Sequence, residues 1–113
     1  MKNHNLYTCN IEKSKINDNY TIWLPEQDDN DFVDLLVEQN DFNQGKLREI
    51  LLKTCAKEDN LDVSSVYFEP EGNVFVAYCR NYDLCKAMEI SLNKMVLNDT
   101  YLSHVVGLSG LSN

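Results

Sequence analysis

Residues 63–79 read VSSVYFEPEGNVFVAYC, and this stretch carries the clearest structural signal in the chain. Two segments rich in β-branched and aromatic residues, 63–69 and 74–79, flank the turn-forming residues 70–73. Gly72 supplies the positive φ that a tight turn requires. The stretch therefore predicts a β-hairpin. Because its second strand is almost entirely apolar, we expect that strand to be central in a sheet or covered on both faces.

The N-terminal quarter of the chain predicts a second hairpin. Residues 6–13 (LYTCNIEK) and 19–24 (NYTIWL) are again rich in β-branched and aromatic residues, and the turn-prone segment 15–19 separates them. Pro25 follows, and it ends the second strand because proline has no amide proton to give to the ladder. The polar residues 26–30 are expected to form a loop.

Four further segments show the spacing of amphipathic helices. The first begins at Asp31 and turns Asp34 and Glu38 outward, whereas Asn81 caps the third. The fourth starts from an Asp99 cap and ends at Gly107. The apolar residues that define the helices are Phe32, Leu35 and Leu36 in the first, Leu47, Ile50, Leu51 and Cys55 in the second, Leu84, Ala87, Met88, Ser91, Leu92 and Met95 in the third, and Tyr101, Leu102 and Val105 in the fourth.

The resulting order ββααββαα predicts an α+β fold, in which an antiparallel sheet made from two β-hairpins has helices packed on it. A length of 113 residues suits one domain, residues 1–113, with a single core. No apolar stretch is long enough to span a bilayer, and the N-terminus leads into a strand-like segment without an apolar signal core. We therefore expect a soluble, cytoplasmic protein.

The net charge of −8 is a local feature of the chain. Between Ile16 and Gly45 there are eight acidic residues and no Lys or Arg, which leaves ten acidic against ten basic residues elsewhere. Such a field repels nucleic-acid phosphates and anionic membranes, and it attracts basic surfaces. We therefore expect the protein to bind neither nucleic acid nor a membrane. An ordinary solvated face is the alternative explanation of the carboxylates, as core packing is for Trp23 and Phe32.

Catalytic and cofactor motifs are weak. The glycines are isolated, so no phosphate-binding loop is present, and the acidic run lacks the spacing of a calcium loop. The four cysteines form no C-x-x-C pair and have apolar neighbours, which predicts reduced core thiols and neither a metal site nor a cofactor. A nucleophilic Cys79 or Cys85 with His104 as base remains an alternative, but packing explains these residues better.

Residues 67–78 (YFEPEGNVFVAY), followed by the Asn81-capped helix with Leu84 and by Asp99-x-x-Leu102, resemble the immunity protein 51 family. These are small bacterial proteins of polymorphic-toxin and contact-dependent growth inhibition systems. The resemblance covers about residues 63 to 106. It implies a cognate-specific inhibitor that binds the toxin domain of a secreted effector in the cytoplasm and blocks its active site or substrate path. It carries over no catalytic residue, so it implies that the chain is not an enzyme.

The charge pattern places the predicted interface in this acidic segment, because a few aromatic anchors dominate the binding energy of many interfaces and charges at the rim set association rate and partner choice. The partner would be a basic toxin domain, such as a nuclease, whose substrate groove the carboxylates would occupy. A small acidic adaptor, or a subunit of a bacterial complex without a toxin, is the alternative function. The predicted partner-binding residues are Trp23, Glu26, Asp28, Asp29, Asp31, Asp34, Glu38 and Asp41.

Overall fold

The computed structural model of the chain describes residues 8–27 and 31–111. It has the order β1β2α1α2β3β4α3α4, so the predicted α+β fold and the order ββααββαα are confirmed. The strands are β1 (Asn10–Lys13), β2 (Tyr20–Leu24), β3 (Tyr67–Phe68) and β4 (Phe75–Cys79), and the helices are α1 (Asp31–Asn40), α2 (Gln44–Glu58), α3 (Tyr82–Leu97) and α4 (Asp99–Ser109).

The four strands form one antiparallel sheet in the order β1-β2-β4-β3. The two hairpins are joined because β2 pairs with β4, with Ile22 opposite Ala77. Strand β4 is therefore central, as its apolar sequence predicts. Only one of its faces is covered, however, since Phe75, Ala77 and Cys79 are buried while the residues between them are partly exposed.

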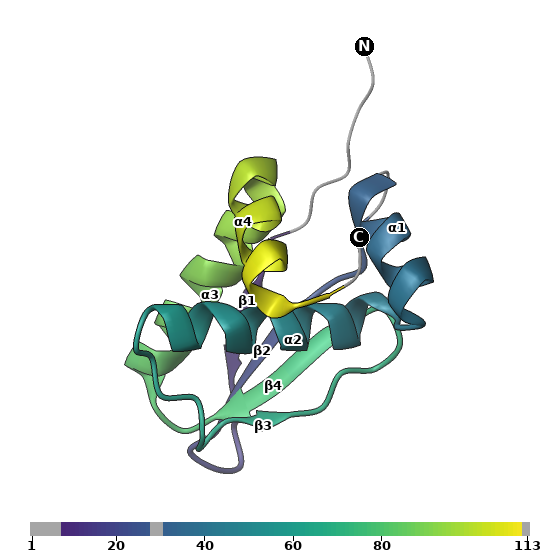
Figure 1. Ribbon diagram of the computed structural model, residues 1–113. Helices are drawn as coiled ribbons and strands as arrows, with labels where there is room; N and C mark the ends of the chain where they lie inside the picture. Colours follow the sequence, from purple (N-terminus) through teal and green to yellow (C-terminus); the bar gives the residue numbers. More distant parts are fainter. Residues whose placement is uncertain (1–7, 28–30, 112–113) are drawn as a thin grey trace.

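The helices are arranged in two further layers. Helices α2 and α3 pack on the sheet, α4 packs on α2 and α3, and α1 packs against α2. Figure 1 shows α4 stacked on the helical layer and α1 near the N-terminal end of α2. The core lies between the sheet and α2 and α3, where the largest fully buried side chains include Phe75, Ile22 and Leu51. None of the described helices is both long and apolar enough to cross a membrane.

The opposite side of the sheet, which we call the open face, carries the side chains that alternate with the core residues. Residue pairing places them in rows across the strands. In one row Tyr78 lies between Tyr67 and Thr21, and in the next Trp23 lies beside Val76. A backbone hydrogen bond from Glu69 to the carbonyl of Val76 extends the pairing beyond β3. The open face is defined by Asn10, Glu12, Thr21, Trp23, Tyr67, Glu69, Val76 and Tyr78.

Local capping and turn chemistry agree with the sequence at several points. Asn81 caps α3, where its side chain accepts a hydrogen bond from the Leu84 amide at 3.0 Å. Gly72 has a φ of +55°, as its turn requires. The cap of α4 is Asn98, not Asp99, and this helix passes through Gly107 to end before Gly110, whose φ is +79°. A glycine is tolerated inside a helix, whereas the left-handed conformation at Gly110 ends one.

Two predicted strands are shorter in the structure. In the segment 63–69 only Tyr67–Phe68 form a strand, because the Asp62 side chain accepts the Ser64 amide and the Val66 amide bonds to Val63, which turns the backbone. In the segment 6–13 the strand starts at Asn10, and residues 6 and 7 lie outside the described ranges. The amide of Cys9 donates to Asn93 Oδ1 of α3 at 2.6 Å.

Candidate protein-binding surfaces

Helix α1 gathers carboxylates on one side. Asp31, Asp34 and Glu38 recur at i, i+3 and i+7, so they share a helix face, and all three are exposed. Within the described part of the chain, no ion pair involves any of them. Their charges are therefore not compensated by a bonded neighbour and face solvent directly.

An exposed leucine lies beside these carboxylates. Leu35 is i+4 from Asp31 and is 43% exposed, whereas Val33 and Leu36 are fully buried. The sequence prediction that placed Leu35 in the inward stripe is therefore wrong. We call the set of Asp31, Asp34, Leu35 and Glu38 the acidic helix face. It places an exposed apolar side chain beside three carboxylates, whose charges would speed association with a basic surface.

The other predicted partner-binding residues are not all part of this surface. Glu26 is exposed in the segment between β2 and α1, and Asp41 is exposed just after α1 with a φ of +56°. Asp28 and Asp29 lie outside the described residues. Trp23 is half-buried on the open face of the sheet, whereas α1 packs against α2 on the helical side. The tryptophan therefore belongs to a different surface from the helix carboxylates.

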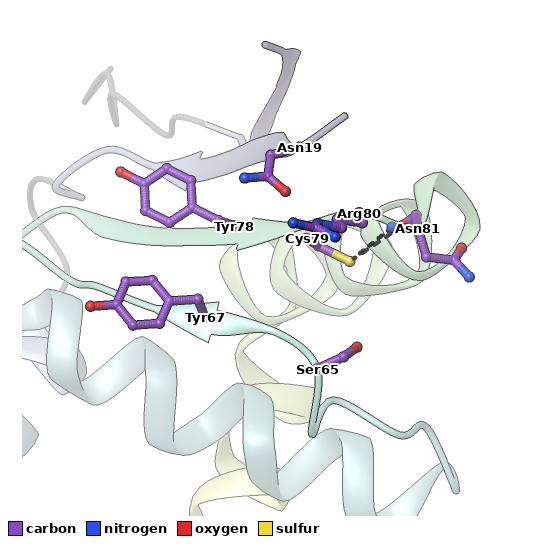
Figure 2. A pocket seen from close by; sticks show the side chains of 7 residues that line it. All are labelled: Asn19, Ser65, Tyr67, Tyr78, Cys79, Arg80 and Asn81. Atoms are coloured by element: carbon purple, nitrogen blue, oxygen red, sulfur yellow. Dashed lines mark hydrogen bonds between the residues drawn. The ribbon is translucent and has the colours of Figure 1, made fainter. Parts of the chain in front are cut away.

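The open face ends in a hollow near the start of α3. It has a volume of about 520 Å³, and it is lined by Asn19, Ser65, Tyr67, Tyr78, Cys79, Arg80 and Asn81. Figure 2 shows Tyr67 and Tyr78 side by side on neighbouring strands, and their ring centroids are 6.1 Å apart in a stacked arrangement. Arg80 is the one charged residue of this lining.

The alternative of a cysteine nucleophile gains no support from the geometry. His104, which was expected to be a packing residue, is instead exposed on α4, and its Nε2 lies 4.0 Å from Glu58 Oε1. Cys79 and Cys85 are buried in β4 and α3, and neither thiol has a hydrogen bond to His104 among the described residues. Burial, followed by interaction with Cys79, raises the pKa of the Cys85 thiol to about 12, which disfavours its thiolate at neutral pH.

All four cysteines are buried free thiols, so their predicted core positions are confirmed. Cys55 Sγ lies 3.8 Å from Met95 Sδ, and Tyr101 Oη donates to the same sulfur at 3.4 Å. No group of three or more His, Cys, Asp or Glu residues within ranges 8–27 and 31–111 is placed to hold a metal ion.

A buried polar cluster at the start of α2 has no counterpart in the sequence prediction. The Gln27 amide donates to Gln44 Oε1 at 2.8 Å, and Gln44 Nε2 donates back to the Gln27 carbonyl at 3.0 Å. The backbone amide of Gln44 also donates to Asn73 Oδ1 at 3.0 Å, which connects α2 to the β3–β4 turn. These bonds join segments that are 17 and 29 residues apart in the chain.

Two charged residues of α2 are also buried. Glu49 pairs with Lys53 at 2.7 Å and with Lys46 at 3.8 Å, and it is only 7% exposed. Arg48 is 2% exposed, and among the described residues its Nε and Nη1 have no hydrogen-bond partner. Burial lowers the pKa of the Arg48 guanidinium to about 10. Only the surrounding elements reveal this burial, since arginine is rarely a core residue.

Comparison of the chain with protein-family profiles, curated proteins and solved structures gives no match.

Proposed function

We propose that this chain is an immunity protein, which binds a cognate bacterial toxin domain in the cytoplasm and blocks its active site or substrate groove. The observation that carries the proposal is the acidic helix face, where Asp31, Asp34 and Glu38 lie on one side of the exposed Leu35 without an ion pair of their own among the described residues. Free carboxylates attract a basic partner and speed its association, and a central apolar side chain adds short-range affinity.

The partner that fits this surface is a basic domain, such as a nuclease whose groove binds phosphates. The carboxylates of α1 would take the place of the phosphates and exclude the substrate. The resemblance of residues 67–78 to immunity protein 51 members agrees with this role, and it concerns the hairpin, which supports the fold and not the binding surface. No residue of the proposal acts as a catalyst.

The primary test is recovery and neutralisation of the partner. Tagged protein is purified from its source cells after a moderate-salt wash, and each domain recovered at equal stoichiometry is expressed alone and together with this chain. We expect a basic domain that stops cell growth when expressed alone and is harmless when this chain is co-expressed. Recovery of housekeeping subunits alone would instead favour the adaptor function.

Charge neutralisation then tests the surface itself. The triple variant Asp31→Asn, Asp34→Asn, Glu38→Gln should slow association with the recovered domain, and the remaining salt dependence should be shallower. The matched control neutralises Asp18, Asp83 and Asp99, three exposed carboxylates outside α1. Equal effects of the two triples would mean that only net charge matters and would refute α1 as the docking site.

The apolar centre of the surface has its own matched pair. Leu35 and Leu108 are exposed to similar extents, 43% and 48%, on α1 and α4. Leu35→Ala should weaken binding by about tenfold, because loss of a central interface side chain typically costs more than about 1 kcal/mol. Leu108→Ala should leave affinity unchanged. An unchanged affinity for Leu35→Ala would remove this residue from the interface.

A further inference from the structure

Among the described residues, no helix covers the open face of the sheet, and its charges are ordered along β3 and β4. Arg80 lies at one end, in the hollow that it shares with Tyr67 and Tyr78. Glu69 lies beside Val76, and Glu71 pairs with Val74 at the other end of the hairpin. Tyr67, Glu69 and Glu71 alternate along the chain, so their side chains share one side of the hairpin. Along β3 and β4 the surface thus runs from a guanidinium, through aromatic and apolar side chains, to two carboxylates. A further carboxylate, Glu12, lies beside Thr21 on β1, at the other edge of the sheet.

This order makes the surface complementary to itself. A two-fold axis lying in the plane of the interface and running across the strands reverses the sequence of rows on the second copy. Arg80 of one copy then comes opposite the row of Val74 and Glu71 of the other, within reach of the Glu71 carboxylate, and the row of Tyr67 and Tyr78 comes opposite the row of Val76 and Trp23. A two-fold interface uses the same patch on both copies, so each such contact is made twice.

We propose that the open face docks a second copy of this chain, forming a two-fold dimer in which two sheets pack face to face. The exposed phenol of Tyr67, 63% exposed and stacked on Tyr78, would be covered in the centre. Two sheets packed in this way lie about 10 Å apart with interdigitated side chains, which suits a centre made of tyrosine, tryptophan and valine.

The position of the charges favours a second copy over the basic partner proposed above. Of the exposed carboxylates, those of α1 lie on a helix that packs against α2, on the helical side of the sheet. The open face has charges of both signs, and a uniformly basic partner would meet Arg80. At about 0.15 M salt, the repulsion between two copies of charge −8 is screened beyond about 8 Å, so local contacts decide association. The dimer does not depend on the toxin proposal.

Sedimentation velocity of the purified chain, without any partner, tests the proposal. We expect the weight-average mass to rise with concentration from 13.0 kDa toward twice that mass. Arg80→Glu alone, and the double variant Glu69→Arg, Glu71→Arg alone, should each weaken the dimer by at least about tenfold, because each brings like charges together twice. Lys57→Glu makes the same charge change as Arg80→Glu on an exposed residue of α2 and should leave the dimer intact.

Mixing the two variants gives the decisive result. In a mixed pair, the carboxylate introduced at position 80 of one copy would meet the guanidinium introduced at position 71 of the other. At the second contact the original Arg80 would meet the original Glu71, so both contacts become attractive. An equimolar mixture should therefore dimerise although neither variant does so alone. Circular dichroism shows that each variant is folded. A chain that stays at 13.0 kDa at every concentration, or a mixture that does not dimerise, would overturn the proposal.

Discussion

The two faces of strand β4 have opposite surroundings although their residues are equally apolar. Phe75, Ala77 and Cys79 are buried under α2 and α3, whereas Val76 and Tyr78, which alternate with them, remain partly exposed on the open face. The difference shows that hydrophobic sequence locates a strand but does not say how many of its faces the fold covers. The two faces should also differ in how much they contribute to stability.

The largest expected effect comes from the covered face. Phe75→Ala should lower the free energy of unfolding by about 3 to 5 kcal/mol, because a fully buried aromatic ring leaves a cavity when removed. Val76→Ala, on the neighbouring residue of the open face, should cost well under half as much at protein concentrations where the chain is a monomer. Urea denaturation followed by circular dichroism measures both. Equal losses would mean that the open face is covered in solution at the concentration used.

The next effect concerns how closely α2 approaches the hairpin. A Cβ added at Gly45 would lie 2.6 Å from the Val74 carbonyl oxygen and 2.7 Å from that of Gly72, and the Gly45 amide donates to Gly72. Gly45→Ala should therefore destabilise the protein by about 1 to 3 kcal/mol through overpacking. The control is Gly107→Ala on α4, where a Cβ meets open space. That change should stabilise the helix by about 0.5 to 1 kcal/mol, and a loss at Gly107 would contradict this explanation.

Replacing the buried Arg48 on the covered side of the sheet should raise the free energy of unfolding, whereas replacing Phe75 should lower it. Its folded-state pKa of about 10, below the ordinary 12.5, means that burial destabilises the charged guanidinium relative to the unfolded chain, although the group stays charged at neutral pH. Arg48→Met keeps most of the volume and removes the charge, so it should raise the free energy of unfolding by about 2 kcal/mol. Thermal and urea denaturation measure this change. A lower stability of Arg48→Met would show that the guanidinium makes a favourable interaction in solution.

The smallest expected effect is a pH dependence at the start of β1. Burial raises the pKa of the Cys9 thiol to about 12, above its ordinary 9. The neutral thiol favours the folded state fully below pH 9, and this stability is lost as pH rises from 9 toward 12. Between pH 8 and 10, the free energy of unfolding should therefore fall by about 1 kcal/mol less in Cys9→Ala than in the unchanged protein. Asn10→Ala, next to it and exposed, should leave the pH dependence unchanged, and an unaltered slope in Cys9→Ala would refute the assignment.

Sequence reasoning succeeds in this protein where the signal is local. The hairpin of residues 63–79 was predictable because Gly72 needs a positive φ and because apolar strands flank it. The cap at Asn81 was predictable because a short polar side chain before an apolar run accepts an amide of the first turn. In both cases the interacting groups are a few residues apart, so the pattern contains all that the structure needs.

Reasoning about the site succeeded only in part. The exposure of Asp31, Asp34 and Glu38 follows from their spacing on one helix face. The exposure of Leu35 does not, because a rotation of α1 about its axis would bury Leu35 in place of Val33. The contact with α2 decides that rotation. The separation of Trp23 from the helix carboxylates likewise depends on which face of the sheet the helices cover.

The sequence by itself determined the type and order of the elements, the two hairpin turns, and the location of the acidic charge, because these depend on side-chain chemistry within about one turn or one hairpin. The tertiary structure alone decided that one face of the sheet stays open and that Arg48 and Glu49 are buried. These outcomes depend on contacts between segments far apart in the chain, such as the hydrogen bond between Gln44 and Asn73. Such contacts form only when the elements pack together, so no local pattern encodes them.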